Sequence, residues 1–188
     1  MIFVPMGLAV LGLIFTAIKA SWVKKQDPGN EKMQSISKAI KEGALAFLNA
    51  EYRLLAIFIM IAALALGTIS YFVATTHWMI IVAFVFGGFF SALAGNIGMR
   101  IATDSNSRTT QAARTSLPQA LKVSFGGGTV MGMGVAGLAV LGLSLFFFIF
   151  VKMFVTGGVD FYNEMTVALE TLAGFSLGAE SIALFARV

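Results

Sequence analysis

Ionisable side chains within an otherwise apolar stretch are the residues of this sequence most able to do chemistry. The last such stretch, about residues 165–188, contains Glu170, Glu180 and Arg187. A charge inside a membrane is costly and usually functional. Glu180 is expected at a depth between the middle of the membrane and the inner third of the membrane, so we predict that it takes part in ion movement. Arg187 lies two helical turns further on, on nearly the same face. The alternative is that Arg187 only reaches the interface and that Glu170 lies at the external side.

Motifs of self-contained catalysis are missing from the sequence. It has no GxxxxGK[ST] phosphate loop and no HExxH zinc motif, and it has no cysteine for thiol or disulfide chemistry. Its one histidine, His77, lies beside Trp78 between two apolar runs, and we interpret it as an interfacial residue rather than a metal ligand. A serine hydrolase would therefore lack its histidine partner. We predict no catalytic residue and no metal ligand in this chain.

The composition indicates which solvent surrounds these residues. Hydrophobic residues make up 58% of the chain and charged residues 12%, whereas soluble domains carry about 25% charged residues. Lipid must therefore solvate much of the surface. The net charge of +4 comes from basic residues in short tracts between apolar runs, a pattern that sets membrane orientation and does not indicate nucleic-acid binding.

Five apolar segments are each long enough to cross a hydrocarbon core of ~30 Å. We therefore predict an all-α integral membrane bundle, with residues 1–188 forming a single transmembrane region. The polar tract at 100–116 is expected to be a loop, and Pro118 suits the first turn of the helix that follows it. The predicted helices span about residues 2–23, 35–74, 78–102, 117–152 and 165–188.

The basic residues also predict the orientation. Six lysines lie between Lys19 and Lys41, and four more basic residues surround the tract at 100–116, so ten of 13 fall on one side of the five-helix layout. The positive-inside rule then places the N-terminus outside, both long loops inside and the C-terminal end at the cytoplasmic side. We expect a multi-pass protein of a cell membrane, with the bacterial inner membrane as its location.

Small residues recur at helical spacing in three of the predicted helices. Such residues let the backbones of membrane helices approach closely, so we predict that these positions pack against neighbouring helices. They are Gly87, Ser91 and Gly95 in the third helix, Gly128 and Gly132 in the fourth, and Gly174 and Gly178 in the fifth.

Four blocks of the sequence resemble membrane-integral pyrophosphatases, in the order and spacing of that family. They look like its second helix, its third helix with the following loop, its fourth helix and its fifth helix. The blocks are KEGALAFLNAEYRLLAIF (41–58), SALAGNIGMRIATDSNSRTTQAAR (91–114), ALKVSFGGGTVMG (120–132) and LAGFSLGAESIALFARV (172–188).

The resemblance implies a homodimeric pump that hydrolyses pyrophosphate with Mg²⁺ on the cytoplasmic side and moves H⁺ or Na⁺ outward, with K⁺ as a possible further cofactor. Arg187 matches the arginine of the family's ion gate. Glu180 falls where some members carry an acidic residue, which favours H⁺.

In the family, FARV continues into an aspartate-rich segment that binds magnesium pyrophosphate, and this sequence ends before it. We therefore expect the chain to correspond to the first five helices of a larger pump, to need the remaining helices as partners and to be inactive alone. The alternative is a stand-alone membrane scaffold or assembly protein without catalysis.

Overall fold

A computed structural model of the protein describes residues 3–72, 77–156 and 160–185, and all regular secondary structure in these ranges is α-helical. Each helix is long and apolar enough to cross a membrane. The predicted all-α membrane bundle of five helices is thus confirmed, while the orientation of its termini stays a prediction. The helices are α1 (Phe3–Lys24), α2 (Glu31–Phe72), α3 (Met79–Ala113), α4 (Leu117–Phe154) and α5 (Phe161–Phe185).

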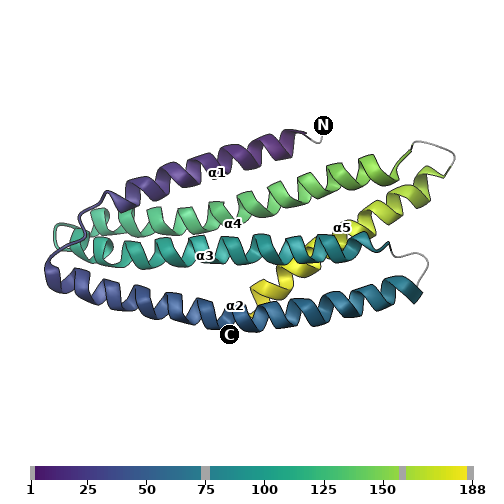
Figure 1. Ribbon diagram of the computed structural model, residues 1–188. Coiled ribbons are helices and arrows are strands. Elements are labelled where there is room, and N and C mark those ends of the chain that lie inside the picture. The colour runs from purple at the N-terminus through teal and green to yellow at the C-terminus, as the bar shows by residue number, and fades with distance from the viewer. Residues whose placement is uncertain (1–2, 73–76, 157–159, 186–188) are drawn as a thin grey trace.

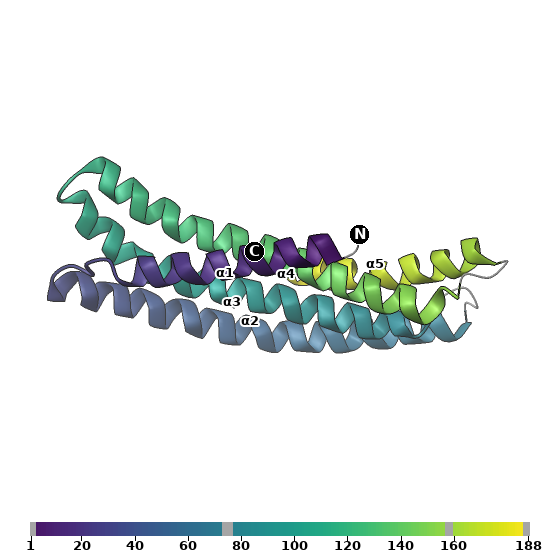
Figure 2. The same ribbon diagram turned by 90° about the horizontal axis from the view of Figure 1, so that it is seen from above.

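Helices α3 and α4 run side by side through the bundle, and the other three pack around them (Figures 1 and 2). Helix α1 packs mainly against α4, and α2 lies along α3. Helix α5 crosses α3 obliquely, and its last described turns approach α2 near the middle of that helix. This crossing brings residues of α2, α3, α4 and α5 together at one level of the bundle.

The structure corrects the predicted end of the third helix, because α3 continues through most of the tract at 100–116 to Ala113. The hydroxyl groups in this tract bond back to the helix itself. Thr103 Oγ1 donates to the carbonyl of Met99 at 2.9 Å, and Ser105 Oγ donates to the carbonyl three residues earlier at 2.8 Å. Ser105 is also buried against Gly127 of α4. Polar composition here therefore reflects helix packing and not a loop.

The crossing of α3 and α5 is close enough that backbone meets backbone. A Cβ atom at Gly178 would contact the carbonyl group of Phe84, and one at Gly174 would lie 2.6 Å from the carbonyl oxygen of Ile80. On the other helix, a Cβ atom at Gly87 would contact the backbone of α5. Three of the small residues singled out in the sequence therefore lie in this interface, where only glycine fits without movement.

The remaining small residues are placed differently. A Cβ atom at Gly95, Gly128 or Gly132 would have no neighbouring atom within 4 Å in the described part of the chain. The expectation that these glycines pack against another helix is therefore not met within the described residues. Gly128 and Gly132 are exposed, whereas Gly95 lines a pocket between the helices. Ser91 is half-buried and lines a pocket described below.

Candidate functional site

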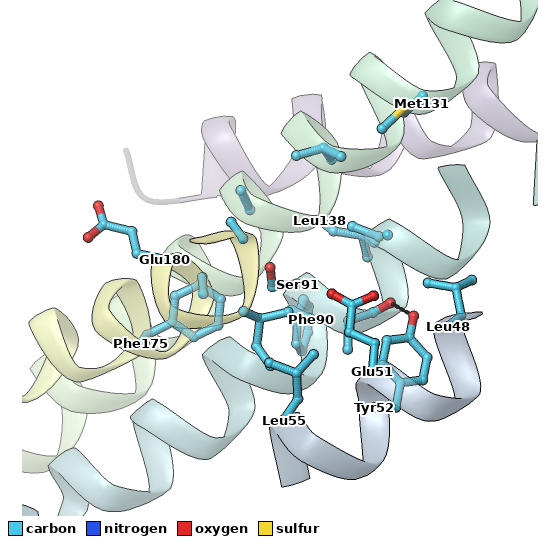
Figure 3. Close-up of a pocket in the computed structure, with 18 residues that line it drawn as sticks. Leu48, Glu51, Tyr52, Leu55, Phe90, Ser91, Met131, Leu138, Phe175 and Glu180 are labelled. Atoms are coloured by element: carbon cyan, nitrogen blue, oxygen red, sulfur yellow. Dashed lines mark hydrogen bonds between the residues drawn. The ribbon is translucent and has the colours of Figure 1, made fainter. Parts of the chain in front are cut away.

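A pocket of about 400 Å³ lies where α2, α3, α4 and α5 meet (Figure 3). Most of its lining is apolar, with side chains such as Leu138 and Phe175. The side chains with oxygen atoms are those of Glu51, Tyr52, Ser91 and Glu180. Among the described residues that line it, two carry carboxyl groups and none is basic.

Glu51 extends from α2 into this pocket (Figure 3). Its Oε1 atom is buried and has no hydrogen-bond partner among the described residues. A buried polar atom without a partner costs free energy, about 1–3 kcal/mol for a neutral group and more for a charged one, so each such case needs an explanation. The next residue, Tyr52, donates its hydroxyl hydrogen to the carbonyl of Ala92 at 2.8 Å and thereby fixes this part of α2 against α3.

Glu51 was not among the site residues expected from the sequence. It precedes the long apolar run of its helix and has other charged residues, such as Arg53, close by in the sequence. A signal was nevertheless present, because Leu48, Glu51, Tyr52 and Leu55 follow the i, i+3, i+4, i+7 spacing of one helix face. Leu48 and Leu55 are both buried, so this face of α2 lies toward the bundle.

Glu180 of α5 lines the opposite flank of the pocket, and its carboxylate is directed away from Glu51 (Figure 3). The side chain is exposed, so within the described residues it faces out of the bundle. Glu170 is exposed as well and does not line the pocket. Arg187, the expected gate residue, lies outside the described residues.

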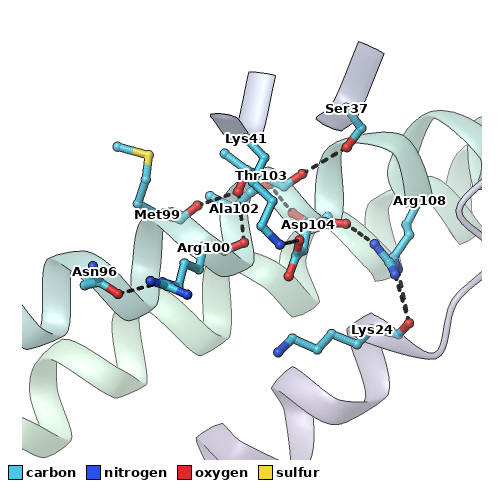
Figure 4. A network of polar contacts seen from close by, with 11 residues as sticks. Lys24, Ser37, Lys41, Asn96, Met99, Arg100, Ala102, Thr103, Asp104 and Arg108 are labelled. Atoms are coloured by element: carbon cyan, nitrogen blue, oxygen red, sulfur yellow. Dashed lines mark hydrogen bonds and ion pairs between the residues drawn. The ribbon is translucent and has the colours of Figure 1, made fainter. Parts of the chain in front are cut away.

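A polar network joins the end of α1, the first part of α2 and the last part of α3, near the α1–α2 turn (Figure 4). Lys41 Nζ of α2 lies 2.6 Å from Asp104 Oδ1 of α3, and the aspartate side chain is only 17% exposed. Arg108 donates to the carbonyl oxygen of Asp104 at 2.5 Å and to that of Lys24, the last residue of α1, at 3.0 Å. The polar extension of α3 thus anchors both preceding helices.

The turn between α1 and α2 is fixed to the same extension. Asp27 accepts a hydrogen bond from the backbone N–H of Gly29 at 2.9 Å and another from Gln111 Nε2 of α3 at 3.0 Å. These two bonds, with the nearby Arg114 guanidinium, hold the pKa of the exposed Asp27 carboxyl below its usual range. Gly29 has φ = +85°, a left-handed conformation that favours glycine.

Within the described ranges, no three His, Cys, Asp or Glu side chains are grouped so that they could hold a metal ion. Magnesium needs near-octahedral oxygen coordination, usually from one or two carboxylates with water and substrate phosphates. The pocket carboxylates point apart, so the residues described do not fit that ion. We assign no residue of this chain to magnesium and derive no chemical step through it.

The comparison with known proteins identifies the family. Residues 10–188 match the family described as inorganic H⁺ pyrophosphatase. The chain belongs to this family. It is therefore a multi-pass membrane protein.

Several relatives are similar over nearly the whole of this chain. A K⁺-insensitive pyrophosphate-energized proton pump of Moorella thermoacetica is 40% identical over 185 residues, which is 98% of this chain and 25% of the relative. A K⁺-stimulated pyrophosphate-energized sodium pump of Thermotoga maritima is 39% identical over 191 residues, 96% of this chain and 25% of the relative. The chain thus spans about a quarter of their length, and overall identity does not distinguish proton from sodium pumps.

Proposed function

We propose that this chain forms the first five helices of a membrane pyrophosphatase that couples cytoplasmic pyrophosphate hydrolysis to outward transport of H⁺. The family match and the length of the relatives support the proposal. In this proposal the remaining helices supply the ligands of magnesium and pyrophosphate, the complete pump is a homodimer, and K⁺ is a candidate second cofactor. The end with the α1–α2 turn, where the basic residues gather, faces the cytoplasm.

The observation that carries the proposal is the pair of carboxyl side chains at the pocket. Glu51 and Glu180 line one pocket within a membrane-spanning bundle, where ionisable residues usually mark an ion path. A single carboxyl group can accept and release a proton alone, whereas a hard metal cation takes several oxygen ligands at once. The pocket's oxygen-bearing side chains are few and its two carboxylates are directed apart, which favours H⁺.

Glu180 has the central part in this proposal. Its side chain lines the pocket and also faces outward from the five helices, where further helices of the pump would contact it. Arg187 is proposed as the arginine of the ion gate, paired with a carboxylate on another helix. Removing one partner of such a buried pair costs about 3–5 kcal/mol, so its loss should impair hydrolysis and transport together.

The experiment measures pyrophosphate hydrolysis and ion uptake in the same vesicles, with the complete pump that contains this chain. We expect Glu180→Ala to lower uptake per pyrophosphate hydrolysed, and Arg187→Ala to lower hydrolysis and uptake together. Glu170→Gln is the matched control, since Glu170 is an exposed carboxylate on the same helix that does not line the pocket. Parent-like coupling in Glu180→Ala, at equal protein amount, would contradict the assignment of Glu180.

A further inference from the structure

Two lysine side chains from different helices meet at one tryptophan ring. Lys19 Nζ of α1 lies 5.1 Å from the ring centroid of Trp22, and Lys122 Nζ of α4 lies 5.8 Å from it. The ring itself is set against α4, where a Cβ atom at Gly126 would come within 2.9 Å of it. Trp22 therefore occupies the room that Gly126 leaves, and both ammonium groups are held at its ring by cation–π attraction.

These two positive charges have no carboxylate partner in the described part of the chain. The ion pairs found there join Lys38 to Glu42 and Lys41 to Asp104, and neither includes Lys19 or Lys122. Two cations that face one ring from neighbouring helices repel each other. An anion that contacts either ammonium group would lessen that repulsion.

The surface next to this pair of lysines is apolar and open. On α1, Phe15 lies one turn before Lys19 and is 43% exposed, and Ile18 directly precedes Lys19 and is 62% exposed. On α4, Phe125 lies about one turn after Lys122 and is 71% exposed. The end of α1 and the start of α4 lie at the same end of the bundle (Figure 1). Cationic groups thus lie at the border of a surface suited to hydrocarbon, with a tryptophan of the kind that gathers at membrane interfaces.

We propose that Lys19, Trp22 and Lys122 form a binding site for the phosphate group of an anionic phospholipid. The two ammonium groups contact the phosphate, Trp22 holds the site at the headgroup level, and the acyl chains lie on Phe15 and Phe125. A free phosphate or pyrophosphate ion would use only the lysines. The exposed rings beside them give a lipid additional apolar contact, and this is why the lipid is the occupant we assign.

The test is a lipid titration of the delipidated protein in a neutral detergent, followed by native mass spectrometry. The probes are phosphatidylglycerol and phosphatidylcholine with identical acyl chains. Phosphatidylglycerol should bind more tightly, and Lys19→Gln with Lys122→Gln should weaken its binding about 25-fold, or about fivefold for one change alone, the factor expected per basic residue near an anionic headgroup. Phosphatidylcholine binding should change less than twofold.

Lys152→Gln is the matched control, because Lys152 also lies over a ring, 5.9 Å from the centroid of Phe148, but without a second lysine. It should leave phosphatidylglycerol binding within twofold of the parent. The double variant Lys19→Arg with Lys122→Arg keeps both charges and should retain binding, which separates loss of charge from loss of fold. Equal binding of the two lipids, parent-like binding by the double Gln variant, or displacement of lipid by millimolar pyrophosphate would each overturn the proposal.

Discussion

Replacing Gly178 by alanine tests whether the α3–α5 crossing sets the stability of the bundle. The added Cβ atom would contact the carbonyl oxygen of Phe84, and it would lie 2.8 Å from the carbonyl carbon of that residue and 3.0 Å from the backbone nitrogen of Gly88. These are backbone atoms, so no change of side-chain rotamer relieves the contact. The two helices would have to move apart along the face that positions Glu180.

The magnitude follows from two opposing effects. Overpacking of a tight interface costs about 1–3 kcal/mol. Alanine in place of glycine favours the helix by up to about 1 kcal/mol, which offsets part of that cost. A net loss of about 1–2 kcal/mol lowers the Tm of a chain of this size by about 2–8 °C. Gly132→Ala is the control, because a Cβ atom there has open space, and its Tm should stay unchanged or rise slightly.

The assay is thermal unfolding of both variants in the same detergent, followed by tryptophan fluorescence. Gly174→Ala should behave like Gly178→Ala, since its Cβ atom would lie 2.6 Å from the carbonyl oxygen of Ile80. The double change at Gly174 and Gly178 should cost less than the sum of its parts, because both separate the same two helices. Equal Tm values for Gly178→Ala and Gly132→Ala would refute the close approach of α3 and α5.

Three further predictions concern the end that carries the α1–α2 turn. Lys41→Ala should destabilise the protein by about 1–3 kcal/mol in chemical unfolding, because it leaves the largely buried Asp104 carboxylate without its ion partner. The double variant Lys41→Ala with Asp104→Ala should lose less than the sum of the two single changes, and strict additivity would exclude their coupling. Because the pKa of Asp27 is lowered in the folded protein, its ionised carboxylate stabilises the fold at pH values above the usual aspartate pKa. This stabilisation is lost as the pH falls through the lowered pKa of the folded state. The parent should therefore lose Tm relative to Asp27→Asn only below about pH 4. Cysteines at the exposed Ser21 and Asn106 should react with an impermeant thiol reagent in inside-out vesicles but not in intact cells, and labelling of intact cells would reverse the topology.

The number of membrane-spanning helices could be predicted from the sequence, because the length and hydrophobicity of the apolar segments indicate how many can cross a membrane. The predicted starts were less accurate, since α2 begins at Glu31 and not near residue 35, and α5 begins at Phe161 and not near residue 165. The end of α3 could not be predicted. Thr103 and Ser105 belong to residue types that favour loops, and their hydroxyl groups satisfy helix carbonyls only once the tract packs against neighbouring helices. Composition therefore indicated a loop where contacts between helices stabilise a helix.

The site was predicted in part. Glu180, whose role stays a prediction, was singled out because it interrupts an apolar run, whereas Glu51, which lines the same pocket, precedes such a run. Glycine spacing likewise could not tell which face of a helix meets a neighbour, since that depends on helix rotation. Gly178 lies in the α3–α5 interface, while Gly128 and Gly132 face away from the neighbouring helices, although all three follow a four-residue repeat.

Pyrophosphate-dependent acidification of inside-out membrane vesicles, made with the complete pump that contains this chain, tests the central claim most directly. The vesicles are held in Na⁺-free medium, and a pH-sensitive dye reports the lumen. Addition of magnesium pyrophosphate should acidify the lumen, and a protonophore should abolish the signal. Hydrolysis without acidification, or transport that begins only when Na⁺ is added, would contradict the assignment of this chain to a proton pump.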